Sequence, residues 1–199
     1  MSAVMESAIE SGIADPVYHE RLMADIHGVA KTANIPESYV WTSIHKYCGQ
    51  AEVNYVSEIK RHTDSEIPIF GMVYKGRIEG APINDRMMSI AGMCLRNYIN
   101  AKVMTLQEVL ASLKSGDMPS PTVLLIPNFY LGSKSGGHIA DWEVSSLIGL
   151  LYKRQQEEQQ TIVYVGDWDG MKLDYGQVFA DHLGFEKFAK ITTDMTIQK

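Results

Sequence analysis

The feature that most constrains this fold is a series of short apolar runs that alternate with helical patterns after residue 66. Three of these runs are continuous and have the length of a strand: 69–74 (IFGMVY), 122–126 (TVLLI) and 161–165 (TIVYV). Uninterrupted apolar strands are typical of a parallel sheet that helices cover on both faces. We therefore predict an α/β fold built on a parallel sheet.

The segments between the runs complete this alternation. Thr105 followed three residues later by Glu108 is a capping-box pattern and predicts a helix over 105–114. Asp167-Trp168-Asp169-Gly170 is expected to be a turn, because it lacks the closing glutamate of a calcium loop. The other expected elements are helices over 86–100, from Asp141 and over 178–183, and strands over 102–104 and 185–191.

The chain before the first strand has a different character. Residues 1–14 show no firm pattern and are expected to form a mobile arm. Asp15-Pro16 suits a helix start, and apolar residues then recur on one helical face as far as Ala33. We predict an N-terminal arm and helical extension over 1–66 and an α/β core over 67–199.

Composition excludes several classes of protein. The 199 residues are 45% hydrophobic and carry a formal net charge of -6, which argues against a protein held to nucleic acid by bulk charge. No apolar stretch approaches the roughly 20 residues of a membrane span, and the acidic start is not a secretory signal. Cys48 and Cys94 form no CxxC pair, and the histidines form no HxxxH pair, so no metal site is expected. A cytoplasmic location is predicted.

The loop after the first strand is where an open parallel sheet is expected to bind its ligand. A phosphate-binding loop reads GxxxxGK followed by Ser or Thr. Residues 80–87 read GAPINDRM, so Gly80 matches the first glycine, while Asp85, Arg86 and Met87 replace the second glycine, the lysine and the hydroxyl residue. Asp85 brings negative charge toward a phosphate, and a methionine does not coordinate a hard cation. The pattern predicts the position of a phosphate loop without its chemistry.

Two other strands test the same idea. In P-loop ATPases a later strand ends in acidic residues that hold magnesium and activate water. Here the strand 122–126 runs into Pro127 and Asn128, neither of which is acidic. The strand 161–165 ends at Gly166, where a polar residue near the terminal phosphate is expected in such proteins.

The order of these segments resembles one protein family. The first strand, loop and helix are followed by NAKVMTLQEVLASLK (100–114), TVLLIPNFYL (122–131), the helix and strand over 141–165, and VFADHL (178–183). This order is similar to the DnaC/IstB-type helicase-loader branch of the AAA+ ATPases, and ANIPESYVWTSI (33–44) resembles the segment that such loaders place before the core. The resemblance implies an AAA+-like, P-loop NTPase-like sheet without a full lid domain, and it places His182 where the family has an arginine finger.

What the resemblance implies for function is a pseudo-ATPase. Such a pseudo-ATPase is expected to need no cofactor. It is expected to act by binding another protein, either a replicative helicase or an active AAA+ ATPase. One alternative is a divergent helicase loader that binds ATP and magnesium, with Arg86 standing in for the lysine. Another is a single-stranded nucleic-acid-binding module, whose expected contacts are Trp41, Lys60, Arg61 and Lys134.

Overall fold

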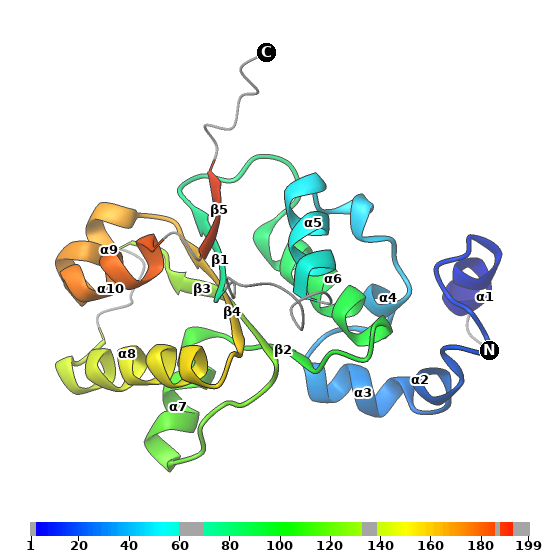
Figure 1. Cartoon of the computed structure of the whole chain (residues 1–199), viewed down its shortest axis with the longest axis horizontal. Helices are drawn as coiled ribbons and strands as arrows, with labels where there is room; N and C mark the ends of the chain where they lie inside the picture. Colours follow the sequence, from blue (N-terminus) through cyan, green and yellow to red (C-terminus); the bar gives the residue numbers. More distant parts are fainter. Residues whose placement is uncertain (1–2, 60–69, 133–138, 186–187, 193–199) are drawn as a thin grey trace.

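A computed structural model of the chain describes residues 3–59, 70–132, 139–185 and 188–192 (Figure 1). The N-terminal part is helical: α1 (Ala3–Glu10), α2 (Glu20–Ala24), α3 (Ile26–Ala33), α4 (Glu37–Val40), the 3-10 helix η1 (Ile44–Lys46) and α5 (Gln50–Ile59). The rest alternates strands and helices: β1 (Gly71–Lys75), α6 (Ile83–Arg96), β2 (Ala101–Val103), α7 (Leu106–Ser115), β3 (Val123–Tyr130), α8 (Asp141–Gln156), β4 (Gln160–Val165), α9 (Trp168–Tyr175), α10 (Gln177–Gly184) and β5 (Phe188–Thr192).

The strands form one five-stranded sheet in the order β2-β3-β4-β1-β5. Every neighbouring pair is parallel, and in the centre of the sheet Val73 of β1 lies opposite Val163 of β4. The prediction of an α/β fold with a parallel sheet is confirmed. The apolar runs are continuous because side chains on both faces of these strands are buried.

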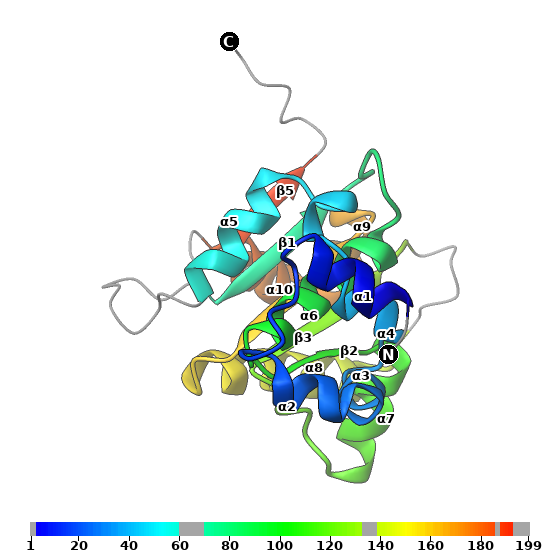
Figure 2. The same cartoon turned by 90° about the vertical axis from the view of Figure 1, so that its right-hand side faces the viewer.

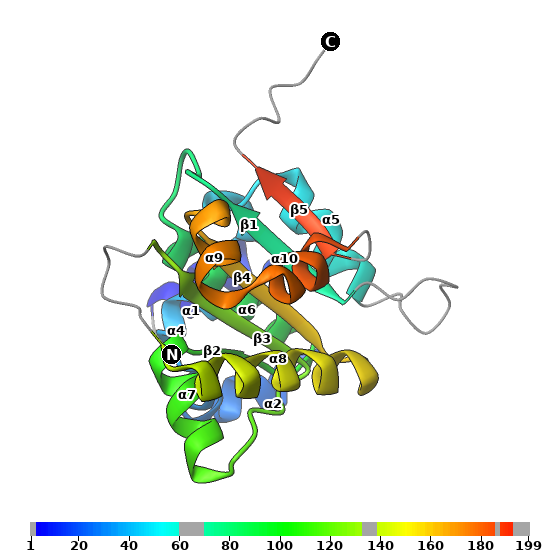
Figure 3. The same ribbon diagram turned by 90° about the vertical axis from the view of Figure 1, so that its left-hand side faces the viewer.

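The two faces of the sheet carry two separate hydrophobic clusters. Met72 and Tyr74 of β1 belong to one cluster and Val73 between them belongs to the other, as the alternation of side chains along a strand requires. Helices α1 to α6 lie on the first face (Figure 2). Helices α7 to α10 lie on the second (Figure 3).

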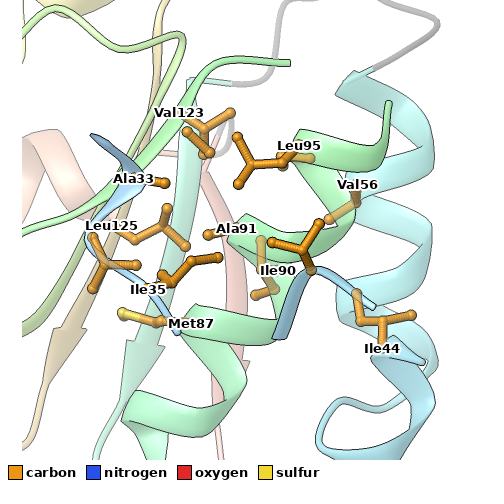
Figure 4. Close-up of a cluster of buried hydrophobic side chains, with 14 of the residues drawn as sticks. Ala33, Ile35, Ile44, Val56, Met87, Ile90, Ala91, Leu95, Val123 and Leu125 are labelled. Atoms are coloured by element: carbon orange, nitrogen blue, oxygen red, sulfur yellow. The ribbon is translucent and has the colours of Figure 1, made fainter. Parts of the chain in front are cut away.

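Helix α6 is enclosed between the sheet and the N-terminal helices (Figure 4). Its residues Met87, Ile90 and Ala91 have no exposed surface. Helix α4 approaches α6 so closely that a Cβ at Gly92 would lie 2.2 Å from the Tyr39 carbonyl oxygen. The N-terminal helices therefore share a core with the sheet instead of projecting from it.

Some local predictions were wrong. Residues 3–10 are not an arm but helix α1, which buries Met5 and Ala8 against the rest of the protein. The chain after Asp15 first makes a turn, and helix α2 begins only at Glu20. The segment expected to be a turn is helix α9, because the Asp167 side chain caps it by accepting a hydrogen bond from the Gly170 N–H.

Strand β3 extends beyond the predicted 122–126 as far as Tyr130, with a register shift between Ile126 and Tyr130. Within the described ranges, no helix is both long and apolar enough to cross a membrane.

Candidate functional site

The connections of β1 and β4 leave the sheet toward opposite faces, which makes their carboxyl ends the expected ligand position. The chain after β1 forms a loop, 76–82, before α6 begins. Gly76 begins this loop, and its N–H donates to the Val165 carbonyl oxygen of β4 at 2.8 Å. Gly80 has a φ of +87°, a conformation that residues with a Cβ rarely adopt. The structure thus places Gly80 in the loop, and Asp85, Arg86 and Met87 within the first two turns of α6.

The Arg86 side chain folds back over this loop. Helical side chains lean toward the N-terminus of their helix, so a residue in the first turns of α6 can reach the loop that precedes it. Its Nε donates to the Ala81 carbonyl oxygen at 3.1 Å, and its Nη2 donates to the Glu79 carbonyl oxygen at 2.7 Å. Its Nη1 donates to Glu52 Oε1 at 2.5 Å. Arg86 therefore fixes the loop from within.

Glu52 comes from α5 in the N-terminal part of the chain. Its side chain is only 2% exposed, and the Arg86 side chain is 13% exposed. The Tyr74 hydroxyl donates to Glu52 Oε1 at 3.3 Å, and the Gly49 N–H donates to Oε2 at 3.0 Å. Both carboxylate oxygens thus have donors, as a buried charge requires.

The two residues that flank Arg86 have structural contacts. The Tyr39 hydroxyl donates to Asp85 Oδ1 at 2.7 Å, which ties α4 to the start of α6. Met87 is completely buried in the first cluster, where its side chain packs rather than facing the loop. Asp85 and Met87 both connect α6 to the N-terminal layer.

Burial dominates the electrostatics around this ion pair. It raises the pKa of the Cys48 thiol to about 12, and the nearby Glu52 carboxylate raises it further. Burial is also the main reason that the pKa of Tyr74 lies well above 10, with Glu52 again adding to the effect. The pKa of Tyr39 is raised by burial and by its hydrogen bond to Asp85. These groups stay protonated at neutral pH, so Tyr39 and Tyr74 act as donors to the two carboxylates.

The positions expected to be acidic in an ATPase lie in β3. Pro127 is buried within the irregular part of this strand. The Asn128 side-chain oxygen accepts a hydrogen bond from the Leu106 N–H at 2.8 Å, and its amide nitrogen donates to Gln107 Oε1 at 2.9 Å. Asn128 therefore supports the first turn of α7.

The expected sensor and finger positions lie in different surroundings. The Gly166 N–H donates to the Tyr130 carbonyl oxygen at 2.7 Å, at the same end of the sheet as the loop. His182 lies in α10 on the opposite face from α6, and its ring contacts Tyr152 and Phe188 with centroid separations of 4.9 and 5.5 Å. Burial lowers the pKa of His182.

The expected nucleic-acid contacts are not brought together by the described residues. Trp41 is 3% exposed and packs in the first cluster, with its ring edge-on to His19, so protein covers its indole faces. Lys60, Arg61 and Lys134 lie outside the described residues.

Sequence reasoning missed Glu52 as a site residue. The sequence pattern that could have revealed it is the helical spacing. Glu52 lies on the same face of α5 as the apolar residues Tyr55, Val56 and Ile59. A second missed contact is between Lys75 and Trp168, whose ring centroid lies 4.3 Å from the lysine Nζ. This cation–π contact joins the end of β1 to the start of α9.

Comparisons with known proteins bear on the fold. No protein-family model matches the sequence, and no curated protein matches it. Solved structures do match: a replication initiator DnaA bound to AMPPCP and single-stranded DNA, with 12% identity and a TM-score of 0.50, and AMPPCP-bound DnaA from Aquifex aeolicus, with 12% identity and a TM-score of 0.51. The matches cover 75% of this chain and 49% of each DnaA chain.

A further match is the structure of a DNA replication initiation factor, with a TM-score of 0.50 and 12% identity, covering 75% of this chain and 48% of that one. The chain shares the α/β fold of these DnaA structures. It spans about half the length of the solved structures that it matches. The expectation of an AAA+-like, P-loop NTPase-like fold is confirmed at this level.

The residues at the loop match a magnesium nucleotide poorly. P-loop NTPases hold phosphate and magnesium with a lysine, a Ser or Thr hydroxyl and an acidic side chain. At the positions that the sequence assigns to these roles, Arg86 is paired with Glu52, Met87 is buried, and Asn128 supports α7. Each of these three side chains therefore contacts other parts of the protein itself.

Proposed function

We propose that this chain is a non-catalytic protein with a DnaA-like AAA+ fold that acts in DNA replication by binding another protein. The observation that carries the proposal is the Glu52–Arg86 ion pair: the guanidinium at the loop is already bound by a carboxylate of the same chain. A cation that is already neutralised and tied to two loop carbonyls is poorly placed to bind a nucleotide phosphate. The phosphate loop is then degenerate, and the protein is a pseudo-ATPase of the cytoplasm.

The partner that we propose is a replicative helicase or an active AAA+ ATPase, in an accessory step of helicase loading. The N-terminal part, 1–66, is the proposed docking region. It exposes an apolar side chain and an aromatic ring in the segment before α2, where Val17 is 87% and Tyr18 is 51% exposed. Exposed apolar groups of this kind favour contact with another protein.

Calorimetric titration of the protein with ATP and with ADP, each with magnesium, tests the absence of a working nucleotide site. We expect no binding at sub-millimolar concentrations. Sub-millimolar binding that the Arg86→Ala variant abolishes would instead favour the alternative of a divergent ATP-binding loader. Melting curves of both proteins show whether the variant is folded.

The binding role is tested by affinity capture from the native host with the wild-type protein and two surface variants. Val17→Asp should lower recovery of a hexameric helicase or an AAA+ ATPase about tenfold, because it places charge in the proposed contact. Leu173→Asp is the matched control, since Leu173 is 84% exposed on α9 and belongs to the opposite face of the sheet. Equal loss with both variants, or recovery of neither class of protein, contradicts the proposal.

A further inference from the structure

The donors around Glu52, in its ion pair with Arg86, are of the kinds that surround a bound anion. The Glu52 carboxylate accepts from a guanidinium, a tyrosine hydroxyl and a backbone N–H, supplied by Arg86, Tyr74 and Gly49. Guanidinium, hydroxyl and backbone N–H donors are also the groups with which proteins hold a phosphate. The difference is that the anion here belongs to the chain itself.

The position of this anion relative to the loop is the second observation. The same guanidinium that donates to Glu52 donates to the carbonyl oxygens of Ala81 and Glu79. One side chain therefore joins the carboxylate of α5 to the loop after β1. In the fold that this chain shares with nucleotide-bound proteins, that loop lies at the carboxyl end of β1, where an open parallel sheet binds its ligand.

Two other ionisable groups nearby have partners of their own. The Asp85 carboxylate accepts from the Tyr39 hydroxyl, and the Cys48 thiol stays protonated and donates to the Arg86 carbonyl oxygen at 3.6 Å. Glu52 is thus the carboxylate that neutralises Arg86 at this site.

We propose that Glu52 is an internal anion that takes the place of a phosphate group at Arg86, so that helix α5 holds the loop 76–82 in the position a bound ligand would otherwise fix. The contact between the N-terminal helices and the loop is then permanent and does not require a nucleotide. A small oxyanion such as inorganic phosphate is expected to occupy the position once the carboxylate is removed. This inference rests on the proposed function only in requiring that the wild-type loop holds no nucleotide.

The experiment is anion rescue of a variant that lacks the carboxylate. Glu52→Ala removes the internal anion and leaves Arg86 buried without its partner, so we expect a lower melting temperature than wild type. When the phosphate concentration is ten times the dissociation constant of phosphate for this variant, inorganic phosphate should raise the melting temperature of the variant by about 3–5 °C. Sodium chloride at equal ionic strength should not do so, and phosphate should leave the wild-type melting temperature unchanged.

Matched variants define what the rescue reports. Glu58→Ala removes an exposed acid from the same helix, so it should behave as wild type with phosphate. The double variant Glu52→Ala, Arg86→Met lacks the cation and should lose the rescue. If Glu52→Ala does not fold without phosphate, its refolding yield should rise with phosphate, whereas Glu52→Gln, whose amide fills the same volume, should show no such rise.

The inference is overturned if folded Glu52→Ala shows the same response to phosphate as wild type, or if the double variant is rescued equally well. It is also overturned if acetate rescues the variant and phosphate does not, because Glu52 would then replace only a carboxylate. None of these measurements uses ATP or a partner protein. Failure of the proposed function would appear instead in the nucleotide titration and the affinity capture.

Discussion

Arg154 shows how a single residue can organise a buried region with neutral partners. It is 1% exposed. Its Nε donates to Thr161 Oγ1 at 2.9 Å, and its Nη2 donates to the carbonyl oxygens of Pro121 and Gln160 at 3.0 and 2.6 Å. Burial lowers its pKa to about 10, so it is still charged at neutral pH. One guanidinium thereby joins α8, the start of β4 and the segment before β3.

Replacing Arg154 is therefore expected to be costly. Arg154→Met leaves several buried acceptors without a donor and should lower the free energy of unfolding by about 3 kcal/mol. The adjacent Lys153→Met is the control: Lys153 is half exposed, its nitrogen lies 3.8 Å from a Glu157 oxygen, and its loss should cost less than about 0.5 kcal/mol. Urea denaturation of both variants measures the difference. Equal effects would mean that the buried hydrogen bonds contribute little.

Residue pairs of this kind were beyond prediction from the sequence. Glu52 and Arg86 are separated by 34 positions, and their contact depends on how α5 packs against α6. The sequence does predict that position 86 lies just after the first strand-to-helix loop. It does not predict that the arginine turns inward, because the acid that draws it there lies in another element.

At the scale of elements, the close approach of α4 to α6 gives a sharp prediction. Gly92→Ala places a methyl group within 2.2 Å of the Tyr39 carbonyl oxygen. The backbone of α4 must then move, and we expect a loss of about 2–3 kcal/mol in the free energy of unfolding. Gly149→Ala in α8 meets nothing within 4 Å, and there the same change should stabilise by about 0.5–1 kcal/mol. Chemical denaturation measures the free energy of unfolding of both variants, and we expect the two changes to have opposite signs. If both variants were more stable than wild type, the close approach of α4 to α6 would be contradicted.

The capping box of α7 predicts a dependence on pH. The Thr105 N–H donates to Glu108 Oε2 at 2.7 Å, and this bond is the main cause that lowers the pKa of Glu108 below its ordinary 4.5. A carboxyl whose pKa is lowered by folding stabilises the protein above its unfolded pKa. That stabilisation is lost as the pH falls through the folded pKa.

Glu108→Gln should therefore be less stable than wild type by about 0.5 kcal/mol at pH 7, a value kept small by solvent screening of an exposed group. The difference should shrink as the pH is lowered below 4.5. Thermal melts at several pH values measure it. A difference that does not change with pH would show that the cap acts without its charge.

Elements were predictable where their signals are local. The capping box of α7 lies within four residues, and it was found as expected. Helices α1 and α9 were missed because each is short, with eight residues, and packing against the core stabilises such helices more than propensity does. The parallel sheet was predictable because burial on both faces leaves a continuous apolar run.

At the scale of the molecule, the sheet separates two hydrophobic clusters, and α6 connects the first of them to the N-terminal helices. Val56 of α5 and Ile44 of η1 pack in the same cluster as Ile90 of α6 (Figure 4). Cys94 of α6 belongs to this cluster as well. Removal of the N-terminal helices would expose this face of α6. The predicted division into 1–66 and 67–199 therefore raises the question of whether the two parts unfold together. Labelling of the two cysteines can answer it.

Cys48 and Cys94 are buried, and burial raises the pKa of both thiols to about 12. Thiolate, the reactive form, is therefore scarce until the protein opens, and labelling with a thiol reagent at pH 8 reports that opening. Cys48 belongs to the N-terminal part and Cys94 to α6, and both lie in the cluster that α6 shares with the N-terminal helices. If the whole chain opens as one unit, the single-cysteine variants Cys94→Ala and Cys48→Ala should label with opening free energies equal to that of urea unfolding. Labelling of both thiols at least about tenfold faster than global unfolding allows would instead show that residues 1–66 separate from the core on their own, because the interface that covers both thiols would have opened first.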